Sequence, residues 1–236
     1  VIGGDTSVGK SSLVLLMALA QSKLGHRPGI ISVEDPKPRW ARRVIAAVTG
    51  VPIAAQRKAD LSRAQWDALN DGVDRIKGTS VHFKFCVGAN LDAVIAAERT
   101  LLRDFGCDVI FLDYIQAVDG VQGAWSRRDE MRIILSRAKA EVNRENAATL
   151  VCLSQMRKRE NATERPVRED LYEANDIAQK ADTIVLLWKD GSRLLNGVLD
   201  KAKDAETGLE FIVERDQTGM LTSSTDGAPY RVGGWS

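Results

Sequence analysis

Residues 4–11 read Gly-Asp-Thr-Ser-Val-Gly-Lys-Ser and match the pattern G-x-x-x-x-G-K-[ST] at every defined position. In a chain of this length, average composition gives the pattern by chance about once in a hundred sequences. The glycines let backbone N–H groups surround phosphate oxygens, Lys10 neutralises the β- and γ-phosphates, and Ser11 offers a hydroxyl to magnesium. A helix favoured by the apolar run from Leu13 to Ala20 would point its N-terminal dipole at the anion. We predict a site for ATP or another nucleoside triphosphate, with Mg²⁺, formed by Gly4, Asp5, Thr6, Ser7, Val8, Gly9, Lys10, Ser11 and Ser12.

The alternative to this interpretation is an ordinary glycine-rich turn before a helix. It does not account for Glu34, Asp113 and Gln155, which each follow a strand-like apolar run. In an open α/β sheet, ligands gather at the carboxyl ends of the strands, so these side chains are predicted to face one crevice.

The three residue types suggest three roles at such a site. Asp113 would support magnesium, Glu34 would orient and polarise the attacking water, and Gln155 would sense the γ-phosphate through a hydrogen bond. For Glu34 an alternative stays open, in which it is a solvated residue beside a turn made by Asp35 and Pro36.

Apolar strand-like runs alternate with helix-like stretches along the chain, which predicts an α/β fold with a mostly parallel central sheet flanked by helices. The periodicity predicts helices over residues 38–49, 60–76, 91–105 and 128–145. It predicts strands over residues 29–33, 81–87, 109–112, 149–153 and 183–188. A polar stretch covers residues 157–170, and short strands that we expect to be antiparallel cover 194–203, 209–215 and 220–223.

The sequence shows no linker that would divide the chain, so we expect one domain over residues 1–223 and a flexible tail over 224–236. A nucleotide-binding loop normally follows a complete strand, whereas only three residues precede Gly4 here. We therefore expect that part of the natural N-terminus is missing.

Composition narrows the choice of partners and compartment. The net charge is only +1, so any nucleic-acid contact must be local, in loops rather than over a whole face. The apolar runs are too short to cross a bilayer, and no signal peptide is visible. Cysteines 86, 107 and 152 are isolated, which predicts small buried residues in a reducing, cytoplasmic compartment. His26 and His82 have no sequence partners for a zinc site.

The order of these elements resembles the C-terminal ATPase domain of DnaB-type replicative helicases over about residues 1–215. The resemblance rests on the segments Ser32-Val33-Glu34, Leu112-Asp113-Tyr114-Ile115-Gln116, Leu153-Ser154-Gln155, Arg165-Pro166, Asp170-Leu171, Ile177-Ala178-Gln179 and Ala181-Asp182. It implies a RecA-like P-loop fold, a hexameric ring with nucleotide between subunits, and ATP-driven movement along one DNA strand. By position it gives Lys10, Ser11, Glu34, Asp113 and Gln155 the roles stated above.

Two departures from the family pattern affect the catalytic and DNA-binding predictions. The family's K-x-R pair, whose arginine reaches into the neighbouring subunit's site, reads Lys201-Ala202-Lys203 here, and lysine lacks the forked geometry that suits a phosphoryl group. Either Lys203 substitutes for that arginine or the ring supplies the charge differently. The family's L-R-E-S-G reads Leu171-Tyr172-Glu173-Ala174-Asn175, so a DNA-facing arginine is replaced by a tyrosine that either stacks on a base or packs internally.

Basic residues in loops complete the nucleic-acid candidates, which are Arg127, Arg128, Arg157, Lys158, Arg159, Tyr172 and Asn175. Acidic residues are interspersed with the later ones, so a solvated mixed-charge loop is an equally open interpretation.

The leading hypothesis is an ATP-dependent replicative DNA helicase motor that hydrolyses ATP, translocates on single-stranded DNA and unwinds duplex. Two alternatives are a regulatory or assembly ATPase without translocation and a RecA-like recombinase, which the D-Y-I-Q segment and the short chain disfavour. The expected partners are single-stranded DNA, further copies in a hexameric ring, and a primase or helicase loader; no membrane partner is expected.

Overall fold

The computed structural model describes residues 1–121, 123–144, 148–191 and 194–222. Within these residues, nine strands form one sheet in the order β3-β2-β4-β5-β1-β6-β7-β8-β9. The strands from β3 to β6 in this order pair in parallel, and β7, β8 and β9 continue the sheet in antiparallel pairs. The predicted fold class, a mostly parallel sheet with antiparallel strands at its C-terminal end, is confirmed.

The strands are β1 (Ile2–Gly4), β2 (Pro28–Ser32), β3 (His82–Phe85), β4 (Val109–Asp113), β5 (Thr149–Gln155), β6 (Thr183–Trp188), β7 (Leu194–Ala202), β8 (Glu210–Arg215) and β9 (Leu221–Thr222). The helices are α1 (Lys10–Lys23), α2 (Lys37–Thr49), α3 (Ile53–Lys58), α4 (Arg63–Lys77), α5 (Leu91–Arg103), α6 (Arg127–Arg144) and α7 (Ala174–Lys180). Two 3₁₀ turns, η1 (Ile115–Ala117) and η2 (Arg168–Asp170), follow β4 and β5.

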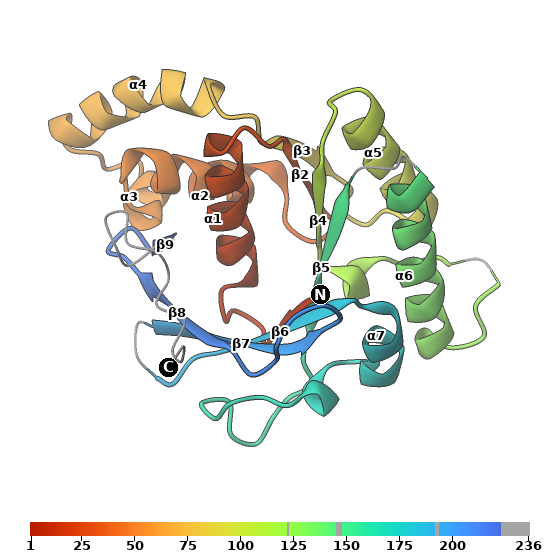
Figure 1. Ribbon diagram of the computed structural model, residues 1–236. Coiled ribbons are helices and arrows are strands. Elements are labelled where there is room, and N and C mark those ends of the chain that lie inside the picture. The colour runs from red at the N-terminus through yellow and green to blue at the C-terminus, as the bar shows by residue number, and fades with distance from the viewer. Residues whose placement is uncertain (122, 145–147, 192–193, 223–236) are drawn as a thin grey trace.

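Helices cover both faces of the sheet, as Figure 1 shows: α1 and α2 lie on one side, and α5, α6 and α7 on the other. The central strand β4 explains why, because its buried residues alternate between two apolar cores. Phe111 packs into the core under α1 and α2, and its neighbours Ile110 and Leu112 pack into the core under α5 and α6. A strand that is apolar on both faces requires a helix layer on each side.

Local sequence signals set several helix boundaries. Helix α4 begins with a capping box in which Ser62 Oγ accepts from the Gln65 backbone N–H, and the Gln65 side chain accepts from the Ser62 N–H. Helix α5 is capped at its N-terminus by the preceding residue Asn90, whose Oδ1 accepts from the Ala93 N–H. Helix α2 ends at Thr49, and the following Gly50 caps it with φ of 76°, a conformation that glycine adopts without strain.

The structure differs from the sequence prediction in a few elements. Residues 2–4, in which no strand was predicted, form β1 at the centre of the sheet, and α3 and α7 were not predicted because each is too short to show a helical period. Helix α4 exists, but Trp66 and Val73 of its predicted apolar face are 53% and 43% exposed, since this peripheral helix packs mainly on α2. Cys107 and Cys152 are buried as predicted, whereas Cys86 is half-buried beside the core. The predicted tail lies outside the described residues, so the domain boundary at 223 stays a prediction.

Candidate functional site

A cleft of about 400 Å³ lies at the carboxyl ends of the parallel strands. Lys10 and Ser11 reach it from the loop after β1, Glu34 from the turn after β2, Asp113 from the end of β4 and Gln155 from the end of β5. Strands that are distant in sequence thus deliver five side chains to one place, because parallel strands end at the same edge of a sheet.

The loop between β1 and α1 has the shape of a phosphate cradle. Gly9 has φ of 126°, and a Cβ at this position would lie 3.0 Å from Arg215 Nη2, so both conformation and space favour glycine. Helix α1 begins at the next residue and presents its free N–H groups and positive dipole end to the cleft. The loop therefore fits a polyphosphate anion.

Lys10 lies where it could bind that anion, and its ammonium group now has backbone carbonyl partners. Its Nζ donates to the carbonyl oxygens of Gly4 at 2.7 Å and Asp5 at 3.0 Å. Burial lowers the pKa of Lys10, and the carboxylates of Asp113, Asp5 and Glu34 oppose that shift. Phosphate oxygens are stronger acceptors for an ammonium than the two carbonyls, so the side chain has a reason to turn toward them.

Ser11 and Asp113 meet at the base of the cleft. Burial raises the pKa of the Asp113 carboxyl group to about 6, against the opposing effects of the neighbouring Ser11 hydroxyl and of the Arg43 charge. Among the described residues no group of three or more His, Cys, Asp or Glu side chains is placed to hold a metal ion. The pair nevertheless fits Mg²⁺, which proteins commonly hold with one or two side chains while phosphate and water complete the coordination.

The turn that carries Glu34 is fixed by its neighbour Asp35, which is 4% exposed. Arg43 Nη1 lies 2.6 Å from Asp35 Oδ2, and Arg39 contacts the other oxygen. Asp35 is therefore a buried carboxylate paired with two arginines rather than a simple turn residue, and it leaves Glu34 as the exposed carboxylate in the cleft. The spacing of Arg39 and Arg43, four and eight residues after Asp35, was the available sequence signal.

Three more arginines line the cleft and were missed from the sequence. Arg42 comes from α2, Arg57 from α3 and Arg215 from β8. With Arg39 and Arg43 they give the cleft more positive than negative side chains, since Glu34, Asp35 and Asp113 also line it, and this excess suits an anionic ligand. Arg57 was hidden because α3 was not predicted, and Arg215 because nothing in sequence relates β8 to the loop after β1.

Gln155 connects the cleft to two neighbouring segments. Its Nε2 donates to Thr6 Oγ1 at 2.5 Å, and its backbone N–H donates to Gln116 Oε1 at 3.1 Å. Gln116 Nε2 also donates to Ser154 Oγ at 2.8 Å, and Arg127 donates to the Gln116 carbonyl oxygen. A continuous hydrogen-bonded path therefore runs from the phosphate loop to the N-terminus of α6.

The predicted nucleic-acid residues fall into two groups. Arg128, Arg157 and Asn175 come from three segments and line a second cavity of about 250 Å³, and Lys158 and Tyr172 are exposed nearby in sequence. Acidic residues share this cavity, and Arg128 Nε lies 2.8 Å from Asp176 Oδ2.

Arg127 and Arg159 have internal partners instead. Arg127 lies 2.5 Å from Glu130 Oε2 besides its contact with Gln116. The Arg159 side chain is 8% exposed, and its guanidinium is bound to Asp5 of the phosphate loop. Internal contacts of this kind leave Arg159 little freedom to reach a nucleic acid.

Lys201 and Lys203 differ in their contacts. Lys201 Nζ donates to the carbonyl oxygens of Ala178 at 2.7 Å and Ala181 at 2.6 Å, at the C-terminal end of α7. Lys203 is exposed just beyond β7. Neither lysine is among the described residues that line the chain's own cleft.

With this geometry in place, comparison with known proteins identifies relatives. The sequence matches the family described as the DnaB-like helicase C terminal domain over residues 1–225. It is 26% identical over 229 residues to a probable plasmid replicative DNA helicase of Chlamydia trachomatis, covering 95% of this chain and 47% of that protein. It is 22% identical over 224 residues to the replicative DNA helicase DnaC of Bacillus subtilis strain 168, covering 94% and 48%. The chain spans about half the length of these relatives.

Solved structures show the same fold. A structure described as an ATPase domain superposes with a TM-score of 0.82 at 21% identity, covering 93% of this chain and 82% of that one. A DnaB-like replicative helicase, described together with its interactions with primase, gives the same TM-score at 20% identity, covering 93% and 56%. In the described part of the chain, every helix is too short or too polar to traverse a bilayer.

Proposed function

The chain belongs to the DnaB-like helicase C terminal domain family, and on that premise we propose that it is the ATP-hydrolysing motor domain of a replicative DNA helicase. The convergence of Lys10, Ser11, Glu34, Asp113 and Gln155 in one cleft carries the proposal. A phosphate cradle alone fits any nucleotide-binding protein, whereas a carboxylate beside it supplies what hydrolysis needs.

Each side chain has one task in the proposed reaction. Lys10 leaves the carbonyl oxygens of Gly4 and Asp5 and neutralises charge on the phosphates. Ser11 and Asp113 hold Mg²⁺, which when bound draws negative charge from the phosphoryl oxygens. Glu34 accepts a proton from the attacking water, and Asp35 with its two arginines keeps the turn below Glu34 rigid.

We extend the proposal to a ring of identical subunits. Lys203 lies outside the cleft of its own chain, so a role on phosphate requires that it enter the cleft of a neighbour. Lys201 is anchored to α7 and would hold the base of the same strand.

Single-stranded DNA is the proposed partner of the surface made by Arg128, Arg157, Lys158, Tyr172 and Asn175. The three residues that line the shared cavity bring donors together, and exposed Tyr172 offers a face for base stacking. A primase or a helicase loader is the further partner that we expect for the assembled motor.

A direct test measures ATP hydrolysis with and without single-stranded DNA at two salt concentrations, using protein whose assembly state is known from light scattering. We expect DNA to stimulate hydrolysis, salt to weaken the stimulation because phosphate contacts release counterions, and Glu34→Gln to abolish turnover. If the assembled protein hydrolyses ATP at the same rate with and without DNA at both salt concentrations, the proposal of a DNA-translocating motor is contradicted.

One observation favours a second candidate, a regulatory ATPase in which nucleotide controls partner binding. Glu169, Glu173 and Asp176 line the same cavity as the predicted DNA residues and would repel a phosphate backbone. The same experiment separates the two, because a regulatory ATPase would hydrolyse ATP without a response to DNA.

A further inference from the structure

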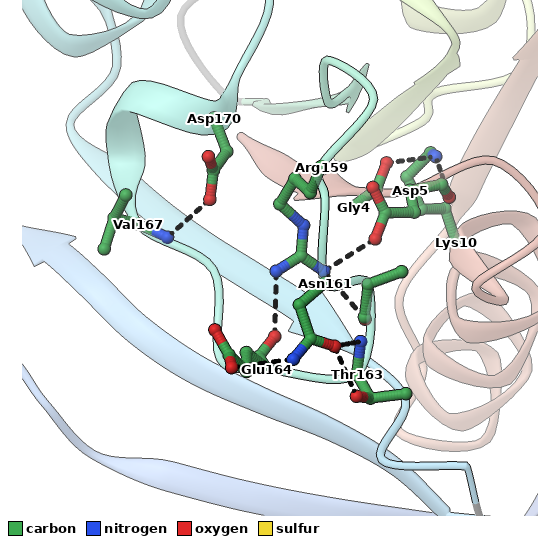
Figure 2. A network of polar contacts seen from close by, with 10 residues as sticks. Gly4, Asp5, Lys10, Arg159, Asn161, Thr163, Glu164, Val167 and Asp170 are labelled. Atoms are coloured by element: carbon green, nitrogen blue, oxygen red, sulfur yellow. Dashed lines mark hydrogen bonds and ion pairs between the residues drawn. The ribbon is translucent and has the colours of Figure 1, made fainter.

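The loop that follows β5 sends one arginine back into the phosphate loop. Arg159 Nη2 lies 2.6 Å from Asp5 Oδ2, and the two side chains are 8% and 23% exposed. Figure 2 shows the guanidinium between the phosphate loop on one side and residues 161–164 on the other. The pair is largely shielded from water, so removing one partner affects the other strongly.

The loop around Arg159 is folded over the guanidinium. Nη1 donates to the Glu164 carbonyl oxygen at 2.8 Å, and Nη2 also donates to the Ala162 carbonyl oxygen at 3.0 Å. Asn161 Nδ2 donates to Glu164 Oε1 at 2.7 Å and closes the turn. The conformation of this segment therefore depends on a charge whose counter-ion belongs to the phosphate loop (Figure 2).

Asp5 occupies a sensitive place in the phosphate loop. Its backbone carbonyl accepts from Lys10 Nζ, the group that would bind the polyphosphate. The Asp5 carboxylate therefore belongs to a residue in direct contact with the phosphate-binding lysine. An unpaired carboxylate there would repel the phosphates, and Arg159 cancels that charge.

A second contact links the same two segments. Gln155 Nε2 donates to Thr6 Oγ1, so two consecutive residues of the phosphate loop, Asp5 and Thr6, are each held by a residue of segment 155–159. Arg157 and Lys158 lie between these two attachment points and are exposed. A movement of the phosphate loop would thus be transmitted to both ends of this basic pair.

We propose that Arg159 is a positioning residue that acts through Asp5: it prepares the phosphate loop for nucleotide and ties the conformation of residues 156–170 to nucleotide occupancy. The inference rests on the proposed nucleotide site and adds to it the residue that couples this site to the basic loop. It also separates Arg159 from its neighbours Arg157 and Lys158, whose side chains face solvent.

The test uses Arg159→Ala, Asp5→Asn and the double variant, with Arg165→Ala as the matched control. Arg165 belongs to the same loop and pairs with Glu210 at 2.6 Å, but both partners are half exposed and the pair lies outside the phosphate loop. Binding of a fluorescent ATP analogue gives affinity, steady-state hydrolysis separates KM from kcat, and hydrogen exchange reports on residues 156–170 with and without the analogue.

We expect Arg159→Ala to weaken nucleotide binding about ten- to a hundredfold, because an unpaired carboxylate remains beside the phosphates. The kcat at saturating ATP should change far less than KM. Adding Asp5→Asn should restore most of the affinity, since it removes the unpaired charge. Nucleotide should slow exchange in residues 156–170 of the unaltered protein and of Arg165→Ala, but not in either variant that lacks Arg159.

The inference is overturned if Arg159→Ala, folded as judged by circular dichroism, binds nucleotide like Arg165→Ala and keeps the protection of residues 156–170. It is also overturned if Asp5→Asn fails to restore affinity. Absence of nucleotide binding by the unaltered protein overturns the proposed function first, and the two failures are therefore distinguishable.

Discussion

The side-chain amide of Gln116 joins η1 to the end of β5: its Oε1 accepts from the Gln155 backbone N–H at 3.1 Å, and its Nε2 donates to the buried hydroxyl of Ser154. Gln116 itself is not among the described residues that line the cleft. A variant of Gln116 can therefore test the transmission of a signal from the nucleotide site without changing a residue that lines the nucleotide site.

Gln116→Ala removes both bonds and leaves the Ser154 hydroxyl without this donor. We expect the free energy of unfolding to fall by about 1–2 kcal/mol, and the stimulation of hydrolysis by DNA to fall while nucleotide affinity is preserved. Denaturant unfolding and ATP hydrolysis with and without DNA measure the two effects. Gln179→Ala, at an exposed position of α7, is the control. Equal DNA stimulation in the two variants contradicts the path through Gln116.

The two arginines that bind Asp35 should contribute unequally to stability. The Arg43 side chain is 19% exposed and the Arg39 side chain 53%, while Asp35 is buried. We expect Arg43→Ala to lower the free energy of unfolding by about 2–4 kcal/mol and Arg39→Ala by less than about 1 kcal/mol. Urea titrations of the two variants give the comparison.

The reason for that difference is testable in the same series. If the loss in Arg43→Ala comes from an unpaired buried carboxylate, then adding Asp35→Asn should recover part of it. A double variant that is less stable than Arg43→Ala would show that packing of the arginine stem, not charge, dominates.

Mixing of two inactive variants tests whether Lys203 acts on a neighbouring subunit. We expect Lys203→Ala and Lys10→Ala each to lower ATP hydrolysis by at least about tenfold. An equimolar mixture should be more active than either alone, because some contacts join an intact Lys203 to a cleft with an intact Lys10. Lys201→Ala should instead lower the melting temperature, since its Nζ binds the end of α7. A mixture no more active than its components excludes action between subunits.

Glu98 predicts a pH dependence of stability. It is 1% exposed on α5, both carboxyl oxygens have no hydrogen-bond partner among the described residues, and burial, with the Glu141 charge adding to it, raises its pKa from 4.5 to about 8. Between these two pKa values the Glu98 carboxyl group keeps its proton in the folded protein but loses it in the unfolded chain. The free energy of unfolding therefore falls as the pH rises from the unfolded-state pKa to the folded-state pKa.

We expect the free energy of unfolding to fall by on the order of 3 kcal/mol between about pH 5 and about pH 8 from this group. Glu98→Gln should flatten that slope and be relatively more stable at the alkaline end. Urea unfolding at a series of pH values measures it, and an unchanged slope in Glu98→Gln shows that another group titrates.

The sequence predicted the parts of the site that depend on local pattern. Asp113 and Gln155 could be placed because each ends a recognisable apolar run, and parallel strands share an edge. The helix that contains Met131, Ile134, Leu135, Ala138 and Val142 could be placed because its apolar residues repeat with the helical period, and these residues are buried as expected.

The features of the site that could not be predicted from the sequence depend on contacts between residues distant in the chain. The Arg159–Asp5 pair spans most of the chain, and periodicity holds no information about which of many arginines meets which carboxylate. Arg215 approaches Gly9 only because β7 and β8 extend the sheet behind the phosphate loop. Strand β1 was overlooked because three residues are too few to show alternation.

That short strand has a consequence for how the protein is made. Its partners are residues 153–155 in β5 and 185–187 in β6, so nearly the whole domain must be synthesised before β1 can be enclosed. Within this domain, the phosphate-binding residues are thus made before the strands that support them, and the pairings at this sequence separation require long loops to close. Nucleotide capture should mark the moment at which the nascent domain finishes folding, and bound nucleotide would then hold the newly closed sheet together.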